Sequence, residues 1–164
     1  MDKKVTQPDS ALKTIPLKTR HLFDMVVYLN EPLQIGRVPK GNRQILLGEG
    51  GEFKGDRLEG IVLPHGADWF LVRDDGVGEL DVRVVLQTKD NARIYMSSTG
   101  YLHYPREKAK RVLSGAASPE EYYLREKTVF ETSADKYGWL NSIVVVGTGW
   151  YKPGSVGMSI YELE

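Results

Sequence analysis

Four charged side chains of the sequence offer acid–base chemistry, and each stands in a segment that mixes polar and apolar residues at alternate positions. In GELDVRVVLQT (78–88), Asp81 and Arg83 share one side of an extended chain, because successive side chains of a strand point to opposite faces. A carboxyl group enclosed in a pocket loses solvation, so its pKa rises towards the range that suits a general base. An arginine beside it can hold a developing oxyanion by charge-assisted hydrogen bonds. The candidate catalytic residues are Asp68, Asp81, Arg83 and Glu131.

Aromatic and hydrogen-bonding residues on the same kind of segment supply a candidate binding surface. Ligand pockets usually combine aromatic walls with a few convergent polar groups. A pocket built from these strands would hold a small hydrophobic or aromatic molecule. The tryptophans are also compatible with simple packing in a core, and Asn141 with a hydrogen bond to a neighbouring loop. The candidate substrate-binding residues are Trp69, Tyr95, Tyr123, Arg125, Trp139 and Asn141.

Two orientations of the strand at 78–88 are open from the residues alone. In the first, its apolar face packs on a core, and Asp81 and Arg83 face water, where cross-strand ion pairs contribute ~0.2–1 kcal/mol each. In the second, Asp81 and Arg83 point into a barrel wide enough to hold one small ligand. The apolar face consists of Leu80, Val82, Val84 and Leu86.

The balance of charges and the absence of cysteine exclude several classes of protein. The 164 residues include 22 basic and 22 acidic side chains, so the chain lacks the basic surplus of a nucleic-acid-binding protein. Without cysteine it has no disulfides, thiolate metal sites or cysteine nucleophiles. The glycine-rich stretches at 48–55 and 147–154 match neither the phosphate-binding loop nor the dinucleotide-binding pattern. His21, His65 and His103 are far apart in sequence, and we expect neither a metal nor a cofactor.

Short segments bounded by turn residues indicate an all-β fold. The glycines at 48, 50 and 51 are typical of a bend at a barrel corner. We predict a flexible N-terminal arm over residues 1–18 and, over residues 19–164, a single closed or nearly closed antiparallel β-barrel of about 8–9 strands with one short helix. The predicted strands are 21–29, 43–55, 58–64, 67–73, 78–88, 93–102, 122–133, 139–149 and 156–163.

One helix interrupts the strands. The segment PREKAKRVLSG (105–115) begins with proline at a favoured first position and ends at glycine. In SPEE (118–121), Ser118 and Glu121 have the spacing of a capping box. No apolar run approaches the ~20 residues that cross a bilayer, and residues 1–20 contain no signal-peptide core. We therefore expect a soluble, cytoplasmic protein without a membrane partner.

Two long blocks of the sequence resemble a known family. The blocks are GGEFKGDRLEGIVLPHGADWFLVRDDGVGELDVRVVLQTKDNARIYMSSTGY (50–101) and YYLREKTVFETSADKYGWLNSIVVVGTG (122–149). Both are similar to the uncharacterised bacterial and fungal family called domain of unknown function 3237. The resemblance implies a β-barrel of the allene oxide cyclase and dirigent type, whose cavity is the natural ligand site. Some fungal relatives are thought to act as cofactor-free cyclases or isomerases.

The resemblance favours the second orientation of the strand at 78–88, because GADW (66–69) and LDVR (80–83) belong to the family's pattern. Asp81 and Arg83 are then expected to face the cavity. The apolar face of that strand would need cover from the helix, from the N-terminal arm or from a second subunit. An uncovered apolar stripe usually marks an interface, so we expect a homodimer.

Three functions are open for such a barrel. The first is a cofactor-free isomerase, cyclase or lyase that acts by acid–base catalysis on a small hydrophobic metabolite, either aromatic or polyketide-like. The second is a non-catalytic carrier that binds a small molecule in the same pocket. The third is a structural or interaction domain with a filled core. An acid and a base within ~3–6 Å in a cavity would separate the first function from the second, because proton transfer needs hydrogen-bond reach.

Overall fold

Eleven strands run through residues 14–164, which are the residues described by the structure, a computed structural model. Residues 1–13 of the predicted N-terminal arm lie outside this range. The strands are β1 (Thr19–Leu29), β2 (Leu33–Val38), β3 (Gly41–Lys54), β4 (Glu59–Val62), β5 (Ala67–Asp68), β6 (Leu71–Val72), β7 (Gly78–Thr88), β8 (Arg93–His103), β9 (Tyr123–Glu131), β10 (Val145–Lys152) and β11 (Ser155–Leu163).

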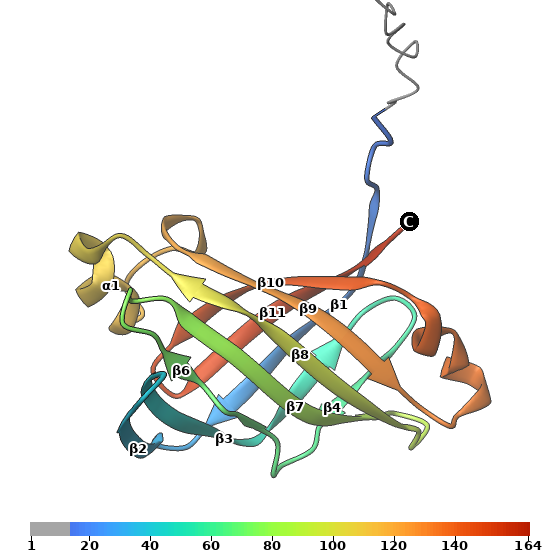
Figure 1. The fold of residues 1–164 in the computed structure, drawn as a ribbon. Helices are drawn as coiled ribbons and strands as arrows, with labels where there is room; N and C mark the ends of the chain where they lie inside the picture. Colours follow the sequence, from blue (N-terminus) through green and yellow to red (C-terminus); the bar gives the residue numbers. More distant parts are fainter. Residues whose placement is uncertain (1–13) are drawn as a thin grey trace, which may run out of the picture.

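Antiparallel pairing closes these strands into a barrel. The order around the barrel is β1, β11, β10, β9, β8, β7, β4 and β3, and β3 pairs again with β1. The short strands β5 and β6 continue the wall between β3 and β7, and β2 pairs with β3. In Figure 1 the strands β7, β8 and β9 cross the front of the barrel. The predicted closed or nearly closed antiparallel barrel of about 8–9 strands with one short helix is confirmed: eight strands close the barrel, and further short strands extend it.

Alternation along the strands decides which side chains fill the barrel. On β7, Leu80, Val84 and Leu86 are buried, whereas Arg83 between them is exposed. The apolar face of this strand therefore lines the interior, and the prediction that it lies outside and needs cover is wrong. The first orientation is the observed one, because burial stabilises apolar surface by ~25 cal/mol per Å² whereas an arginine keeps its hydration outside.

The segment predicted as the strand at 67–73 forms two short strands instead. After β5 ends at Asp68, the Trp69 N–H donates to the Asp81 carbonyl of β7, and the Phe70 carbonyl accepts from Gln44 N–H of β3. The segment thus stays in the wall while its ladder is interrupted. This interruption leaves the Asp81 N–H to bond the Asp68 carboxylate, which matters for the site described below.

Glycine lets two strands approach closely where the barrel closes. A Cβ on Gly51 of β3 would lie 1.9 Å from the Val26 carbonyl oxygen of β1, so no larger residue fits there without moving a strand. The register of β1 and β3 shifts between Tyr28 and Leu29, close to these glycines. The bend that the glycine pattern predicts at 48–51 is thus the point at which β3 meets β1.

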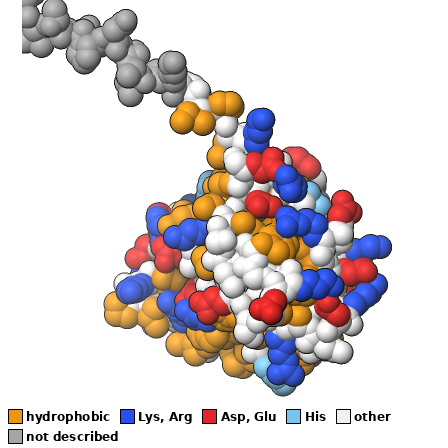
Figure 2. All heavy atoms as spheres, turned by 90° about the vertical axis from the view of Figure 1, so that its right-hand side faces the viewer, with side chains coloured by type: hydrophobic (Ala, Val, Ile, Leu, Met, Phe, Trp, Pro, Cys, Tyr) orange, Lys and Arg blue, Asp and Glu red, His pale blue; other side chains and the backbone are white. Residues whose placement is uncertain are grey.

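A 3₁₀ helix, η3 (Asp135–Ser142), covers one end of the barrel. Tyr137 and Leu140 of this helix are buried, and the guanidinium of Arg57 lies 3.5 Å from the ring centre of Trp139. The predicted strand at 139–149 is therefore wrong over its first six residues. Leu140 is buried as part of the 3₁₀ helix, and the strand begins only at Val145. Figure 2 looks onto this end and shows charged side chains of both signs among hydrophobic ones.

The opposite end of the barrel carries the helical segments that follow β8. They are η1 (Arg106–Lys108), α1 (Ala109–Leu113) and η2 (Pro119–Glu121). The predicted helix and the predicted capping box are both present, since the Glu121 carboxylate accepts from the Ser118 N–H at 2.9 Å. Among residues 14–164 no helix has the length and apolar character to cross a membrane.

Candidate active site

The interior of the barrel contains a cavity of about 290 Å³ near the end that carries α1. Most of the lining side chains are aliphatic, and they come from nearly every strand of the barrel. Leu113 of α1 and Pro32, in the turn before β2, reach the cavity from its rim. Two carboxyl groups interrupt this apolar lining, those of Asp68 and Glu126.

Asp68 stands at the end of β5, where the ladder is interrupted. Its Oδ1 accepts a hydrogen bond of 2.9 Å from the Asp81 N–H, and the partly buried side chain lines the cavity. Desolvation is the main cause that raises the pKa of Asp68 to about 7, and the neighbouring charge of Asp81 contributes to the rise. The Asp81 N–H and the positive charge of Arg43 act in the opposite direction, because both favour the carboxylate.

Glu126 points inward from the middle of β9 and is only 6% exposed. Its Oε1 accepts a hydrogen bond of 3.2 Å from the Thr128 hydroxyl, which in turn lies 2.7 Å from the Ser98 hydroxyl. Desolvation raises the pKa of Glu126 to about 7, against the lowering effect of the two hydroxyls. The charge of Asp68 contributes to the rise, so the two carboxyl groups sense each other electrostatically.

The sequence makes room for this buried acid on the neighbouring strand. A Cβ on Gly147 of β10 would lie 2.8 Å from Glu126 Cγ and 3.0 Å from Ile160 Cδ1. The glycine at this position therefore leaves the space that the Glu126 side chain occupies.

At neutral pH, two electrostatically coupled carboxyl groups with pKa values near 7 are each protonated part of the time. When one is ionised, its charge opposes ionisation of the other. The singly ionised pair consists of a carboxylate, which can accept a proton, and a carboxylic acid, which can donate one. The cavity thus holds a base and an acid together in an apolar environment.

The prediction that Asp81 and Arg83 face the cavity is wrong. Their side chains form an ion pair of 3.1 Å on the outer wall and are 43% and 47% exposed. They lie outside because the alternation of β7 turns Leu80, Val82 and Val84 inward. Asp81 still contributes to the site through its backbone N–H, which donates to Asp68.

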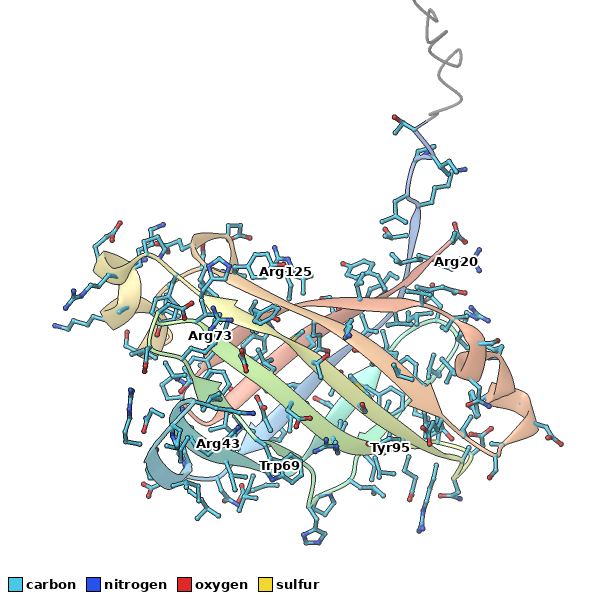
Figure 3. All side chains as sticks on the ribbon, in the orientation of Figure 1. Arg20, Arg43, Trp69, Arg73, Tyr95 and Arg125 are labelled. Atoms are coloured by element: carbon cyan, nitrogen blue, oxygen red, sulfur yellow. The ribbon has the colours of Figure 1, made fainter. Side chains whose placement is uncertain are left out.

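Four predicted residues come together on the outer wall instead of inside the barrel. They line a shallow, open hollow of about 970 Å³ that crosses the outer face of β7, β8 and β9. Figure 3 shows Trp69 and Arg125 on either side of the β7 and β8 ribbons. These four residues are Trp69, Asp81, Tyr123 and Arg125.

The other predicted site residues contact neither the cavity nor this hollow. Tyr95 and Glu131 are opposite one another on β8 and β9, with side chains directed outward. Trp139 and Asn141 belong to η3 at the far end of the barrel, and Asn141 bonds the backbone of Thr132 through both its amide atoms. Of the ten predicted residues, Asp68 alone lines the interior cavity.

The sequence analysis did not identify Glu126 as a site residue, because charged residues flank it on both sides. Arg125 and Lys127 flank it, so the run reads as a solvated charged face. The alternate positions, Leu124, Glu126, Thr128 and Phe130, form the inner face, where a single acid stands among apolar and hydroxyl residues. That isolated acid was the available signal. No cluster of three His, Asp or Glu side chains suited to a metal ion occurs within residues 14–164.

The site thus defines a class of small β-barrel with two buried carboxyl groups at an apolar cavity. Residues 17–163 match the family described as protein of unknown function DUF3237, and the chain belongs to this family. It is 32% identical over 145 residues to a UPF0311 protein of Clostridium acetobutylicum, covering 87% of this chain and 92% of that protein. Over 151 residues it is 28% identical to a UPF0311 protein of Rhodopseudomonas palustris, covering 92% of this chain and 99% of that one.

Solved structures share the barrel. A beta-barrel like protein of Acinetobacter baumannii superimposes with a TM-score of 0.81 at 34% identity, over 93% of this chain and 99% of the other. A structure from Penicillium herquei has a TM-score of 0.73 at 19% identity, over 94% of this chain and all of the other, so the two share the fold.

Proposed function

We propose that this protein is a cofactor-free isomerase, cyclase or lyase that transfers a proton on a small, largely apolar carbonyl compound held in the barrel cavity. The observation that carries the proposal is the presence of Asp68 and Glu126 at one apolar cavity, each with a pKa raised to about 7. A catalytic acid or base works best when its pKa lies near the operating pH. A barrel of the same fold from Penicillium herquei is described as an enzyme.

The surroundings of the two carboxyl groups assign their roles. Asp68 is the base, because the Asp81 N–H and the charge of Arg43 both favour its ionised form. Glu126 is the acid, because it is more deeply buried and has no cationic neighbour that lowers its pKa. Asp68 removes a proton from the carbon next to the carbonyl, and Glu126 donates its proton to the carbonyl oxygen, so that an enol forms. In a substrate with a carbon–carbon double bond next to the acidic carbon the enol is a dienol: Asp68 returns the proton at its far carbon, the enol O–H gives its proton back to Glu126, and the double bond has moved. In a substrate with a second carbonyl group, the enol carbon attacks that carbonyl carbon to close a ring; the new alkoxide takes the proton from Asp68, and the enol O–H returns its proton to Glu126.

The lining of the cavity indicates the charge and size of the substrate. The residues that line it, all within 14–164, include no Arg, Lys or His, so an anion would meet two acids and no compensating cation. A neutral carbonyl compound avoids this repulsion. The volume of about 290 Å³ lies just below the ~300–1,000 Å³ of typical ligand pockets, which favours a compact molecule.

Hydrogen–deuterium exchange at carbon tests the proposal without knowledge of the natural substrate. The protein would be incubated in D₂O with a panel of neutral carbon acids, beginning with 2-tetralone, 2-indanone and cyclic β-diketones, and deuterium uptake followed by mass spectrometry. The wild type is expected to accelerate exchange of at least one probe, and D68N and E126Q are expected to lose at least ~100-fold of that rate, the usual size of an acid–base contribution.

Matched controls come from the outer wall. Glu52 and Glu131 are exposed carboxylates on the same sheet, so E52Q and E131Q should exchange at the wild-type rate. Binding of probes without any exchange would contradict the enzyme and leave the carrier barrel as the function of the cavity. Equal exchange by D68N and the wild type would contradict the assigned base.

A further inference from the structure

The hollow on the outer wall across β7, β8 and β9 faces away from the cavity, and the two linings have Leu80 and Glu126 in common. Three aromatic side chains in it are notably exposed: Trp69 by 36%, Tyr101 by 49% and Tyr123 by 43%. Aromatic residues gathered on an open surface are typical of protein interfaces. We propose that a second copy of this chain binds here, about a twofold axis that runs along β8, and that this face forms the interface of a homodimer.

The charges of this wall are arranged in rows across three strands. In each row an acid stands on β7, an uncharged residue on β8 and a base on β9. Cross-strand pairing places the members of each row directly beside one another. The two rows are Glu79, Tyr101 and Arg125, and Asp81, Thr99 and Lys127.

A twofold axis along β8 makes this arrangement self-complementary. Rotation by 180° about that axis keeps each residue at its level along the strand and exchanges the β7 side of one copy with the β9 side of the other. Glu79 then lies over Arg125 of the second copy, and Asp81 over Lys127, each contact being made twice. A twofold axis across the strands would instead set β7 over β7 and β9 over β9, which places acid over acid and base over base. The pattern of charges therefore selects the axis along β8.

The residues beyond these rows fit the same axis. The Trp69 N–H donates to the Asp81 carbonyl, so Trp69 lies beside Asp81 on the outer side of β7. On the opposite flank, Val146 of β10 pairs with Lys127. Trp69 and Val146 thus lie at equivalent places on either side of β8, where they flank the two rows of charges. Figure 3 shows Trp69 and Arg125 separated by β7 and β8, as this arrangement needs.

The acids of the wall already have partners within the chain, which leave part of each side chain available. Arg73 lies 3.3 Å from Glu79, and Arg83 lies 3.1 Å from Asp81. The acidic side chains nevertheless remain 41% and 43% exposed. A carboxylate has lone pairs for several donors, so each acid can accept from a second copy as well.

The proposed interface leaves the cavity open. The hollow lies on the wall of the barrel, whereas Leu113 and Pro32 mark the rim of the cavity at the α1 end. The dimer is thus independent of the proposed function, and either can fail without the other.

Charge reversal tests the pairing across the axis. Sedimentation velocity at low ionic strength would compare the wild type with D81K, K127E and the double variant D81K/K127E. The wild type is expected to sediment as a dimer. Each single variant should raise the dissociation constant of the dimer at least tenfold, and the double variant should return that constant to the wild-type value. E52K, a charge reversal on the exposed part of β3 outside the hollow, is the control and should remain dimeric.

A cysteine on the axis supplies an independent readout. Because the chain has no cysteine, T99C introduces a single thiol that faces its own copy across the interface, and a short bis-maleimide should link two chains. The control E52C should remain unlinked. A monomeric wild type, a dimer that D81K leaves intact, a double variant that stays monomeric, or a T99C protein that does not crosslink would each overturn the proposal.

Discussion

The carboxyl groups of Asp68 and Glu126 enter one cavity from β5 and β9, strands that are separated in the wall by β7 and β8. The charge of Asp68 adds to the desolvation that raises the pKa of Glu126. Neither acid is close to the other in sequence, and the coupling arises only when the barrel closes. A pair of acids in an apolar cavity opposes folding when ionised, so its presence indicates a role other than stability.

The first prediction concerns the pH dependence of stability. The pKa of Glu126 rises from 4.5 in the unfolded chain to about 7 in the barrel, so between these values the unfolded chain releases a proton that the folded one retains. The free energy of unfolding attributable to Glu126 therefore falls as the pH rises through this window, by about 3 kcal/mol at most, and is constant above it. Urea unfolding of the wild type and E126Q from pH 4.5 to 8 measures the difference.

E131Q is the control for this experiment, because Glu131 is exposed on the same strand. It should follow the wild-type pH dependence. If the wild type and E126Q lost stability in parallel as the pH rose, Glu126 would not be the group that titrates.

The second prediction concerns the hydroxyl that bonds Glu126. T128V keeps the shape of the side chain but removes the donor that stabilises the Glu126 carboxylate. The pKa of Glu126 should rise further, by about one to two units, because a hydrogen bond to a charged group contributes ~1.5–3 kcal/mol. A ¹³C NMR titration of labelled glutamate side chains measures the pKa directly. T128S retains the hydroxyl and should titrate like the wild type, whereas a lowered pKa in T128V would contradict the arrangement.

The sequence predicted the barrel well, because alternation and turn residues are local signals that survive folding. It predicted Asp68 at the site, since an acid beside an apolar segment is visible without a structure. The prediction that Asp81 and Arg83 face the interior was wrong, because alternation along the strand separates a charged face from an apolar face but does not show which of the two lines the barrel. Glu126 was not predicted because Arg125 and Lys127, which lie on the outer face, make this run resemble a solvent-exposed charged segment.

The strand predicted from 139 failed for a different physical reason. Residues such as Trp139 and Ile143 suit a strand locally, yet the open end of a barrel must be covered. The stacking of Arg57 on Trp139 and the burial of Leu140 stabilise a 3₁₀ turn there instead. Both contacts join parts of the chain that are distant in sequence, which a local pattern does not report.

The third prediction concerns the cavity itself. Val82 lies on the inner face of β7 and borders the cavity. V82F should place its ring in the empty space, so that binding of a small aromatic probe is lost while the free energy of unfolding changes by less than about 1.5 kcal/mol. Fluorescence titration with 2-naphthol measures binding, and V85F, on the outer face of the same strand, is the control. Retention of 2-naphthol binding by V82F would show that the probe binds elsewhere.

The fourth prediction concerns the charge of the ligand. Because Asp68 and Glu126 are the charged groups of the described lining, the cavity should discriminate between ligands of the same shape and different charge. 2-Naphthol, which is neutral at pH 7, should bind at least tenfold more tightly than 2-naphthoate, whose carboxylate meets the ionised member of the pair. Lowering the pH to 5 protonates both acids, whose pKa values are about 7, while 2-naphthoate remains mostly ionised, so the discrimination should shrink. In the D68N/E126Q double variant it should be small at both pH values. Competition titrations at the two pH values distinguish these outcomes, and equal affinity of the wild type for both compounds at pH 7 would show that the two acids do not set the charge preference of the cavity.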